Sequence, residues 1–144
     1  MTKRLGIFLI TMLLSITPVA GEVEQARETD RHTIYYNVLP TSALPEAMAR
    51  AYGITRSDTR VLLNITVRER EEDRTIPVSA RINAQAVNLN GQLKRFSMRE
   101  ISEEDAIYYI GDVGVNRGEI LNFTLRVAPE GERREEVIEF QRAF

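Results

Sequence analysis

Apolar and polar residues alternate at a period of two along most of the chain after residue 32. The pattern is clearest at 61–67 and 121–127, where every second residue is a large apolar one. Successive side chains of a β-strand point to opposite faces of the sheet, so this alternation predicts strands with one buried face. The chain is therefore predicted to be mainly β.

Turn signals divide the pattern into about seven strands. Asn90-Gly91 is the strongest of them, because both residues accept the positive φ angles of a two-residue hairpin. Before it, the alternation of 76–86 changes phase at Val87 and Leu89, which predicts a bulge or bend. The predicted strands cover 33–39, 61–67, 76–89, 93–101, 106–110, 121–127 and 137–144. Strands joined by such short turns predict an antiparallel β-sandwich of immunoglobulin-like architecture.

One short helix is predicted within this pattern, over 45–53. Pro45 suits the first turn of a helix, and Glu46 suits its positively polarised end. The residues that follow are good helix formers, and Gly53 can adopt the left-handed conformation that ends a helix. The segment 56–59 is then predicted to be a turn that leads to the next strand.

The N-terminus has the three-part layout of a secretory signal peptide. Lys3 and Arg4 precede an apolar run over 5–16, and small residues follow, with cleavage predicted after Gly21. The apolar run is shorter than the roughly 20 residues that cross a bilayer, so no transmembrane segment is expected in the mature chain. The predicted organisation is a signal peptide over 1–21, a flexible lead-in over 22–32 and a single β-sandwich domain over 33–144.

Composition narrows the location and the partners. The chain has no cysteine, which excludes disulfides and thiolate metal sites. An exported protein without disulfides points to the bacterial periplasm. The formal charge of −2 becomes −4 when Lys3 and Arg4 are removed with the signal peptide. This mild acidity gives no reason to expect nucleic acid as a partner.

No residue pattern typical of a catalytic or metal site is present. His32 is the only histidine and follows a charged lead-in, so it is predicted to be solvated. The acidic groups 71–73 and 103–105 are consecutive residues, whereas a calcium loop spaces its oxygen ligands at alternate positions around a glycine. Both groups are predicted to be solvated turns. No cofactor, metal ligand or catalytic residue is assigned.

A binding surface is the better prospect, because tyrosine and arginine side chains suit recognition. Such residues gather between 35 and 60. The alternative is a structural role, in which Tyr36 and Tyr52 pack the helix onto the sandwich while Arg56 and Ser57 hold the loop. The candidate binding residues are Asn37, Tyr52, Arg56, Ser57 and Arg60.

An ordered series of short blocks resembles domain-of-unknown-function family 4426, small exported proteins of Gram-negative bacteria. The blocks are Tyr36-Asn37, Pro45-Glu46, Ala51-Tyr52-Gly53-Ile54, Arg56-Ser57, Leu62-Leu63-Asn64-Ile65, Gly91-Gln92-Leu93, Arg99-Glu100-Ile101 and Asp105-Ala106-Ile107-Tyr108-Tyr109-Ile110. The resemblance implies a periplasmic β-rich domain and brings no activity or cofactor with it. In the family a threonine precedes Pro45-Glu46, whereas this chain has Leu44, whose side chain cannot cap a helix.

Two functions from different classes follow from these observations. The preferred one is a non-catalytic periplasmic domain that binds a protein or peptide partner in the cell envelope. The alternative is an envelope hydrolase or small-ligand-binding enzyme with its site near the helix and Arg56. A deep pocket beside Arg56 with converging carboxylates or hydroxyls would favour the alternative.

Overall fold

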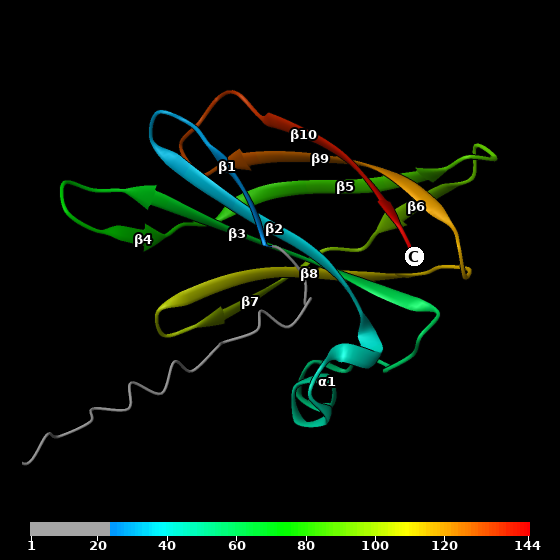
Figure 1. Cartoon of the computed structure of the whole chain (residues 1–144). Coiled ribbons are helices and arrows are strands. Elements are labelled where there is room, and N and C mark those ends of the chain that lie inside the picture. Colours follow the sequence, from blue (N-terminus) through cyan, green and yellow to red (C-terminus); the bar gives the residue numbers. More distant parts are fainter. Residues whose placement is uncertain (1–23) are drawn as a thin grey trace, which may run out of the picture.

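The computed structural model describes residues 24–144, which form two antiparallel sheets packed face to face (Figure 1). The predicted mainly-β antiparallel sandwich is confirmed, with ten strands where about seven were expected. The predicted signal peptide, 1–21, lies outside the described residues. No helix within 24–144 is long and apolar enough to cross a membrane.

The first sheet has the order β1-β2-β3-β8-β7, with β4 paired to the far end of β3. The second sheet has the order β10-β9-β5-β6. The strands of the first sheet are β1 (Gln25–Glu28), β2 (His32–Pro40), β3 (Arg60–Arg70), β4 (Thr75–Pro77), β7 (Arg99–Glu103) and β8 (Ala106–Gly114). Those of the second are β5 (Ala80–Asn88), β6 (Leu93–Phe96), β9 (Ile120–Pro129) and β10 (Glu136–Ala143). A 3-10 turn, η1 (Thr41–Ala43), and one helix, α1 (Glu46–Tyr52), separate β2 from β3.

The main core lies between the sheets, and the period-two pattern identified its inward faces correctly. The apolar residues of that pattern in β3 and β9 are all at most 1% exposed: Val61, Leu63, Ile65, Val67, Leu121, Phe123, Leu125 and Val127. Phe123 stacks on Phe140 of β10 with ring centroids 4.6 Å apart. Burying each such side chain stabilises the fold by about 1.5–3 kcal/mol.

Two predicted long strands are each divided, because the chain crosses from one sheet to the other. The predicted strand 76–89 becomes β4 in the first sheet and β5 in the second. Likewise, 93–101 becomes β6 and β7. The bulge predicted at Val87 is absent, since β5 pairs with β9 in unbroken register from Ala80 to Asn88. Leu89, the other residue of the apparent phase change, lies in the hairpin turn and is 68% exposed.

The strand predicted over 106–110 is longer in the structure. Strand β8 continues through Gly111 to Gly114. A Cβ atom on Gly111 would lie 2.8 Å from Met98 Sδ and 2.9 Å from the Ser97 carbonyl oxygen. This glycine therefore allows the β6–β7 crossover to pass directly over the strand.

The start of the domain is more ordered than a flexible lead-in. Within the segment 22–32, Gln25–Glu28 form β1, which pairs with β2 along its whole length. The prediction that His32 is solvated is also wrong, because only 3% of the residue is exposed. Its Nδ1 lies 3.9 Å from Glu132 Oε1 in the loop after β9, which contacts this end of the sandwich.

Candidate binding site

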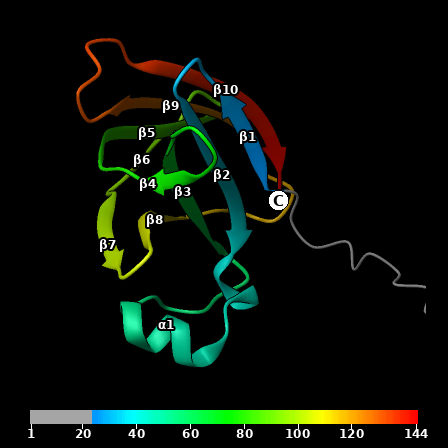
Figure 2. The same cartoon turned by 90° about the vertical axis from the view of Figure 1, so that its left-hand side faces the viewer.

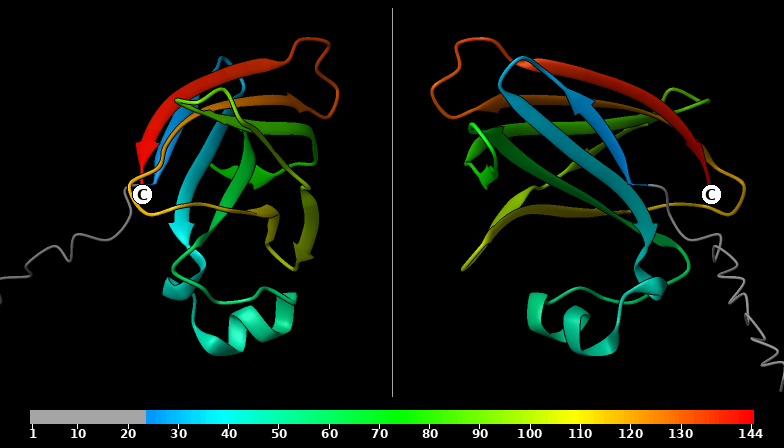
Figure 3. Two further views of the ribbon diagram at one scale, coloured as in Figure 1. Left: turned by 90° about the vertical axis from the view of Figure 1, so that its right-hand side faces the viewer. Right: turned by 60° about the vertical axis from the view of Figure 1, so that its left-hand side comes forward.

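Helix α1 lies below the outer face of the first sheet, on the side away from β9 and β10 (Figures 2 and 3). It begins at Glu46, and its N-cap residue is Pro45, one position after the expected Leu44; no side chain caps the helix. It ends at Gly53, whose φ of 64° is left-handed. This conformation lets the Ile54 amide donate to the Ala49 carbonyl at 2.8 Å, which satisfies one orphan carbonyl of a short helix.

Apolar side chains hold α1 and its flanking segments against the sheet. This second cluster is separate from the main core and consists of Leu39, Leu44, Ala49, Ile54, Leu62 and Ile110. Three of these, Leu39, Leu62 and Ile110, lie on the outward-facing side of β2, β3 and β8. In a sheet with one face in solvent, residues on that side are usually polar. The outer face of the first sheet is therefore partly covered.

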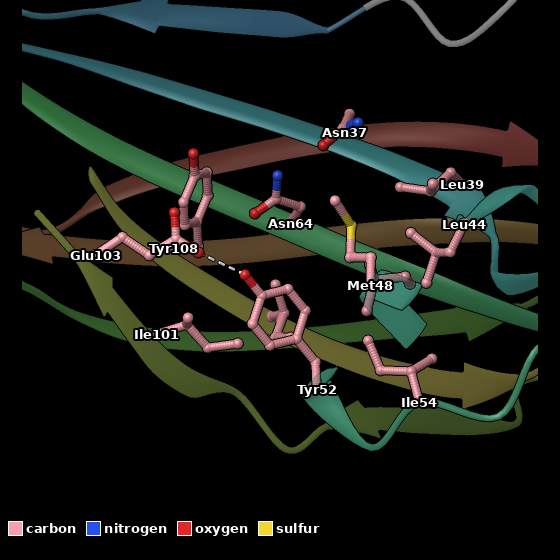
Figure 4. Close-up of a pocket in the computed structure, with 12 residues that line it drawn as sticks. Asn37, Leu39, Leu44, Met48, Tyr52, Ile54, Asn64, Ile101, Glu103 and Tyr108 are labelled. Atoms are coloured by element: carbon pink, nitrogen blue, oxygen red, sulfur yellow. Dashed lines mark hydrogen bonds between the residues drawn. The ribbon is translucent and has the colours of Figure 1, made fainter. Parts of the chain in front are cut away.

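The packing leaves a pocket of about 280 Å³ between α1 and the sheet (Figure 4). Its walls are mostly apolar, with side-chain amides, one carboxylate and two tyrosines among the lining groups. The lining residues are Asn37, Leu39, Leu44, Met48, Tyr52, Ile54, Leu62, Asn64, Ile101, Glu103, Tyr108 and Ile110. Met48 is 44% exposed although it is apolar.

The two asparagines are direct neighbours across β2 and β3. Asn64 Oδ1 is buried and has no hydrogen-bond partner among residues 24–144. A buried polar atom without a partner is rare in folded proteins, because it loses its bonds to water without replacement. Asn64 therefore has an unused acceptor, and its side chain lines an apolar pocket.

Tyr52 closes the pocket on the side of β7. Its ring reaches from α1 toward Glu103, and its hydroxyl donates to Glu103 Oε1 at 2.6 Å (Figure 4). This hydrogen bond to a carboxylate raises the pKa of Tyr52 above its ordinary value. A second contact ties the end of α1 to β7, where the Arg99 guanidinium donates to the Tyr52 carbonyl.

The pocket continues into a shallower, polar depression on the open half of the same sheet face. Asn64 and Tyr108 line both, and the depression is also lined by Tyr35, Thr66 and Arg68. Its remaining lining residues are Glu24, Val67, Thr75, Pro77, Ala106 and Ile107. We refer to the pocket and the depression together as the α1 groove.

The structure separates the five candidate residues into two groups. Asn37 and Tyr52 line the α1 groove. Arg56 and Ser57 hold the loop after α1, since Arg56 Nη2 donates to the Ser42 carbonyl at 2.8 Å and the Ser57 amide donates to Thr41 Oγ1 at 2.9 Å. Arg60 forms a 2.6 Å ion pair with Asp112 of β8.

The tyrosines likewise take different roles. Tyr36 packs on the inner side of the first sheet, with its ring 5.1 Å from that of Phe140, and therefore does not hold the helix. Tyr108 and Tyr109 are adjacent in β8 and point to opposite faces. Tyr108 lines the groove, whereas Tyr109 is buried and its hydroxyl accepts a hydrogen bond from the Ala80 amide at 2.8 Å.

The sequence analysis did not select several residues of the α1 groove, although the sequence contained a signal for them. Leu39, Leu62, Ile101 and Ile110 are apolar residues on the phase of their strands that faces away from the main core. Apolar residues on both sides of a strand indicate that both faces of its sheet are covered. Met48 lines the pocket only because of where α1 packs, and the sequence pattern did not indicate this.

No group of three or more histidine, aspartate or glutamate side chains within the described part of the chain is placed to hold a metal ion.

Comparison with family models places residues 26–144 in one family. The chain belongs to the DUF4426 family, a domain of unknown function. Its fold is similar to the crystal structure of a DUF4426 family protein from Pseudomonas aeruginosa PAO1, with a TM-score of 0.72 and 29% identity over 84% of this chain and 94% of that one. No curated protein matches the sequence.

The fold of this DUF4426 protein is also similar to that of FetP from uropathogenic Escherichia coli strain F11. A copper-bound FetP variant has a TM-score of 0.58 at 10% identity, over 85% of this chain and 95% of that one. FetP recombinantly expressed in the periplasm of E. coli has the same TM-score at 11% identity, over 86% and 95%. At such identities the likeness extends to the fold alone.

Proposed function

We propose that this DUF4426 protein is a non-catalytic domain of the bacterial periplasm that binds a protein or peptide partner of the cell envelope in the α1 groove. The predicted signal peptide and the missing cysteines support export to that compartment. FetP, which has a similar fold, has been produced in the periplasm of E. coli.

The pocket beneath α1 is the observation that carries the proposal. Its volume of about 280 Å³ falls just below the range of about 300–1,000 Å³ for pockets that enclose drug-sized ligands. A mostly apolar pocket of this size suits one or two side chains of a partner, which act as an anchor in many interfaces. The partly exposed Met48 adds an adaptable apolar surface at its edge.

The arrangement around Arg56 supports binding over hydrolysis. The guanidinium of Arg56 donates a hydrogen bond to the Ser42 carbonyl, and Arg56 does not line the pocket. Glu103 is the carboxylate that lines it, and its Oε1 accepts the Tyr52 hydroxyl. A hydrolytic site would need a second acid or base beside such a group.

In-cell photocrosslinking tests the proposal. A photoreactive residue at position 48 reaches the groove, and one at Glu139, an exposed residue of β10 in the other sheet, is the control. We expect one envelope protein to be captured at position 48 and not at position 139.

The crosslinked segment of that protein is then synthesised and its binding measured. We expect it to bind the purified protein and to bind Asn37→Trp much more weakly, since the larger ring takes up space in the pocket that Asn37 lines. Equal capture at both positions, or none in a folded and exported protein, contradicts the proposal.

A further inference from the structure

We infer that the α1 groove binds an extended peptide segment in which an apolar residue is followed by a basic one, with Asn64 hydrogen-bonded to the peptide main chain. This inference rests on the proposed function and specifies the chemistry of the partner segment.

The unused acceptor of Asn64 points to a main-chain contact. A side-chain amide offers an acceptor and two donors, which match the N–H and C=O of a peptide group. Asn37, directly opposite on β2, places a second amide beside it. A simple acyl chain could fill the apolar pocket but has no donor for Asn64 Oδ1, so these neighbouring amides favour a peptide.

The length of the groove agrees with an extended segment. It follows β3 from Leu62, beneath α1, to Arg68 on the open half of the sheet. Six residues of a strand span about 20 Å. An extended peptide of about six residues has the same length, with its apolar side chain under α1.

The charge around the groove selects a basic residue. Glu103 and Glu24 both line it, and Glu104 and Asp105 follow Glu103 in the turn to β8. The lining cation, Arg68, donates to the Thr75 side chain and carbonyl, each at 2.9 Å. Negative charge therefore predominates at this rim.

Glu103 is the best-placed acceptor for that basic side chain. Tyr52 uses its Oε1, and a carboxylate has a second oxygen that can accept a charge-assisted bond. The contact would lie beside the pocket, so the basic residue is expected next to the apolar anchor or one position further along the peptide.

Selection from a phage-displayed library of random nine-residue peptides tests the inference. The target is the protein purified from the cells that export it. We expect enrichment of an apolar residue with lysine or arginine one or two positions later. The enriched sequence is then synthesised with a fluorescent label, together with a form in which norleucine replaces the basic residue.

Glu103→Gln removes the charge and keeps an acceptor for Tyr52, which separates recognition from folding. We expect this variant to bind the basic peptide about fivefold to tenfold more weakly and the norleucine peptide unchanged. Glu139→Gln, on the other sheet, should change neither. N-methylation of the peptide bond beside the apolar anchor tests the role of Asn64. It should weaken binding to the natural protein about tenfold and change binding to Asn64→Ala little.

The outcomes separate the two proposals. If peptides bind in the groove, as shown by loss of binding in Asn37→Trp, but show no basic preference and no coupling to Asn64, this inference is overturned and the proposed function stands. If no peptide is enriched and crosslinking at position 48 captures nothing, both are overturned.

Discussion

Gly111 is the residue on which the contact between the β6–β7 crossover and the first sheet depends. An added Cβ would meet Met98 Sδ, a flexible end, and the Ser97 carbonyl, which belongs to the backbone. Because the backbone cannot give way cheaply, we expect Gly111→Ala to lower the free energy of unfolding by about 1–3 kcal/mol. Urea denaturation followed by circular dichroism measures this.

Gly114 supplies the matched control for that substitution. It lies in the same strand, and the nearest atoms to an added Cβ are at 3.8 and 3.9 Å, an ordinary contact distance. Gly114→Ala should therefore leave the free energy of unfolding within about 0.5 kcal/mol of its natural value. Equal losses for the two variants would mean that glycine flexibility matters there, and not the close approach.

Glu119 makes stability depend on pH. Burial by itself would raise the pKa of this carboxyl, but hydrogen bonds from the Asn116 amide and Asn88, together with the Lys94 ammonium at 3.2 Å, lower it below its ordinary value. A lowered pKa in the folded state means that the unfolded chain binds the proton more tightly. This contribution to stability is present above the ordinary pKa and is lost as pH falls through the folded value.

Urea denaturation between pH 7 and pH 3 tests this linkage. We expect Glu119→Gln to be destabilised by about 3 kcal/mol at pH 7, because the side chain of Lys94 is left buried without a counter-charge. The variant should also lose less stability on acidification than the natural protein. Glu139→Gln, an exposed change, is the control; if Glu119→Gln has the natural pH dependence, the assignment to this carboxyl fails.

At the scale of elements, α1 is held to the first sheet by side-chain packing and by contacts of its C-terminal turn. Its C-terminal turn is tied to β7 by the Tyr52–Glu103 hydrogen bond and by Arg99. We expect Tyr52→Phe to increase hydrogen exchange in Glu46–Tyr52 while the global free energy of unfolding changes by less than about 0.5 kcal/mol, since this bond is exposed.

Tyr35→Phe is the control for the helix experiment. Tyr35 lies on β2 and lines the polar depression but not the pocket beneath α1. Its replacement should leave exchange in α1 unchanged. If both variants, or neither, increase exchange in the helix, the Tyr52 hydroxyl does not hold α1 in place.

At the scale of the whole molecule, three crossovers and one shared core join the sheets. The chain passes between the sheets after β4, after β6 and after β8, and side chains of both sheets form a single cluster. The two sheets are therefore expected to unfold together. The tyrosines report on the first sheet and α1, because all five lie there: Tyr35, Tyr36, Tyr52, Tyr108 and Tyr109.

Tyrosine fluorescence and far-ultraviolet circular dichroism should consequently give superimposable urea transitions. The dichroism signal includes the second sheet, whose described aromatic residues are phenylalanines. The chain has no tryptophan to obscure the tyrosine signal. A tyrosine transition displaced from the dichroism transition would show that the sheets unfold separately.

The sequence alone determined the features that depend on neighbouring residues. The period-two pattern identified the inward faces of β3 and β9, because the two faces of a strand alternate regardless of what covers them. Asn90-Gly91 located the β5–β6 turn, where Gly91 has a φ of 81°. Gly53 likewise located the end of α1.

Only the tertiary structure decided which strands are partners and where the groove lies. Alternation continues from 76 to 86 although the chain changes sheets between β4 and β5, because the pattern identifies a buried face and not the neighbour that buries it. Asn37 meets Asn64 through strand register, and Tyr52 meets Glu103 across 51 residues of sequence. Such contacts depend on how distant segments pack, and so the pocket, the unused acceptor of Asn64 and the acidic rim came together only in the folded molecule.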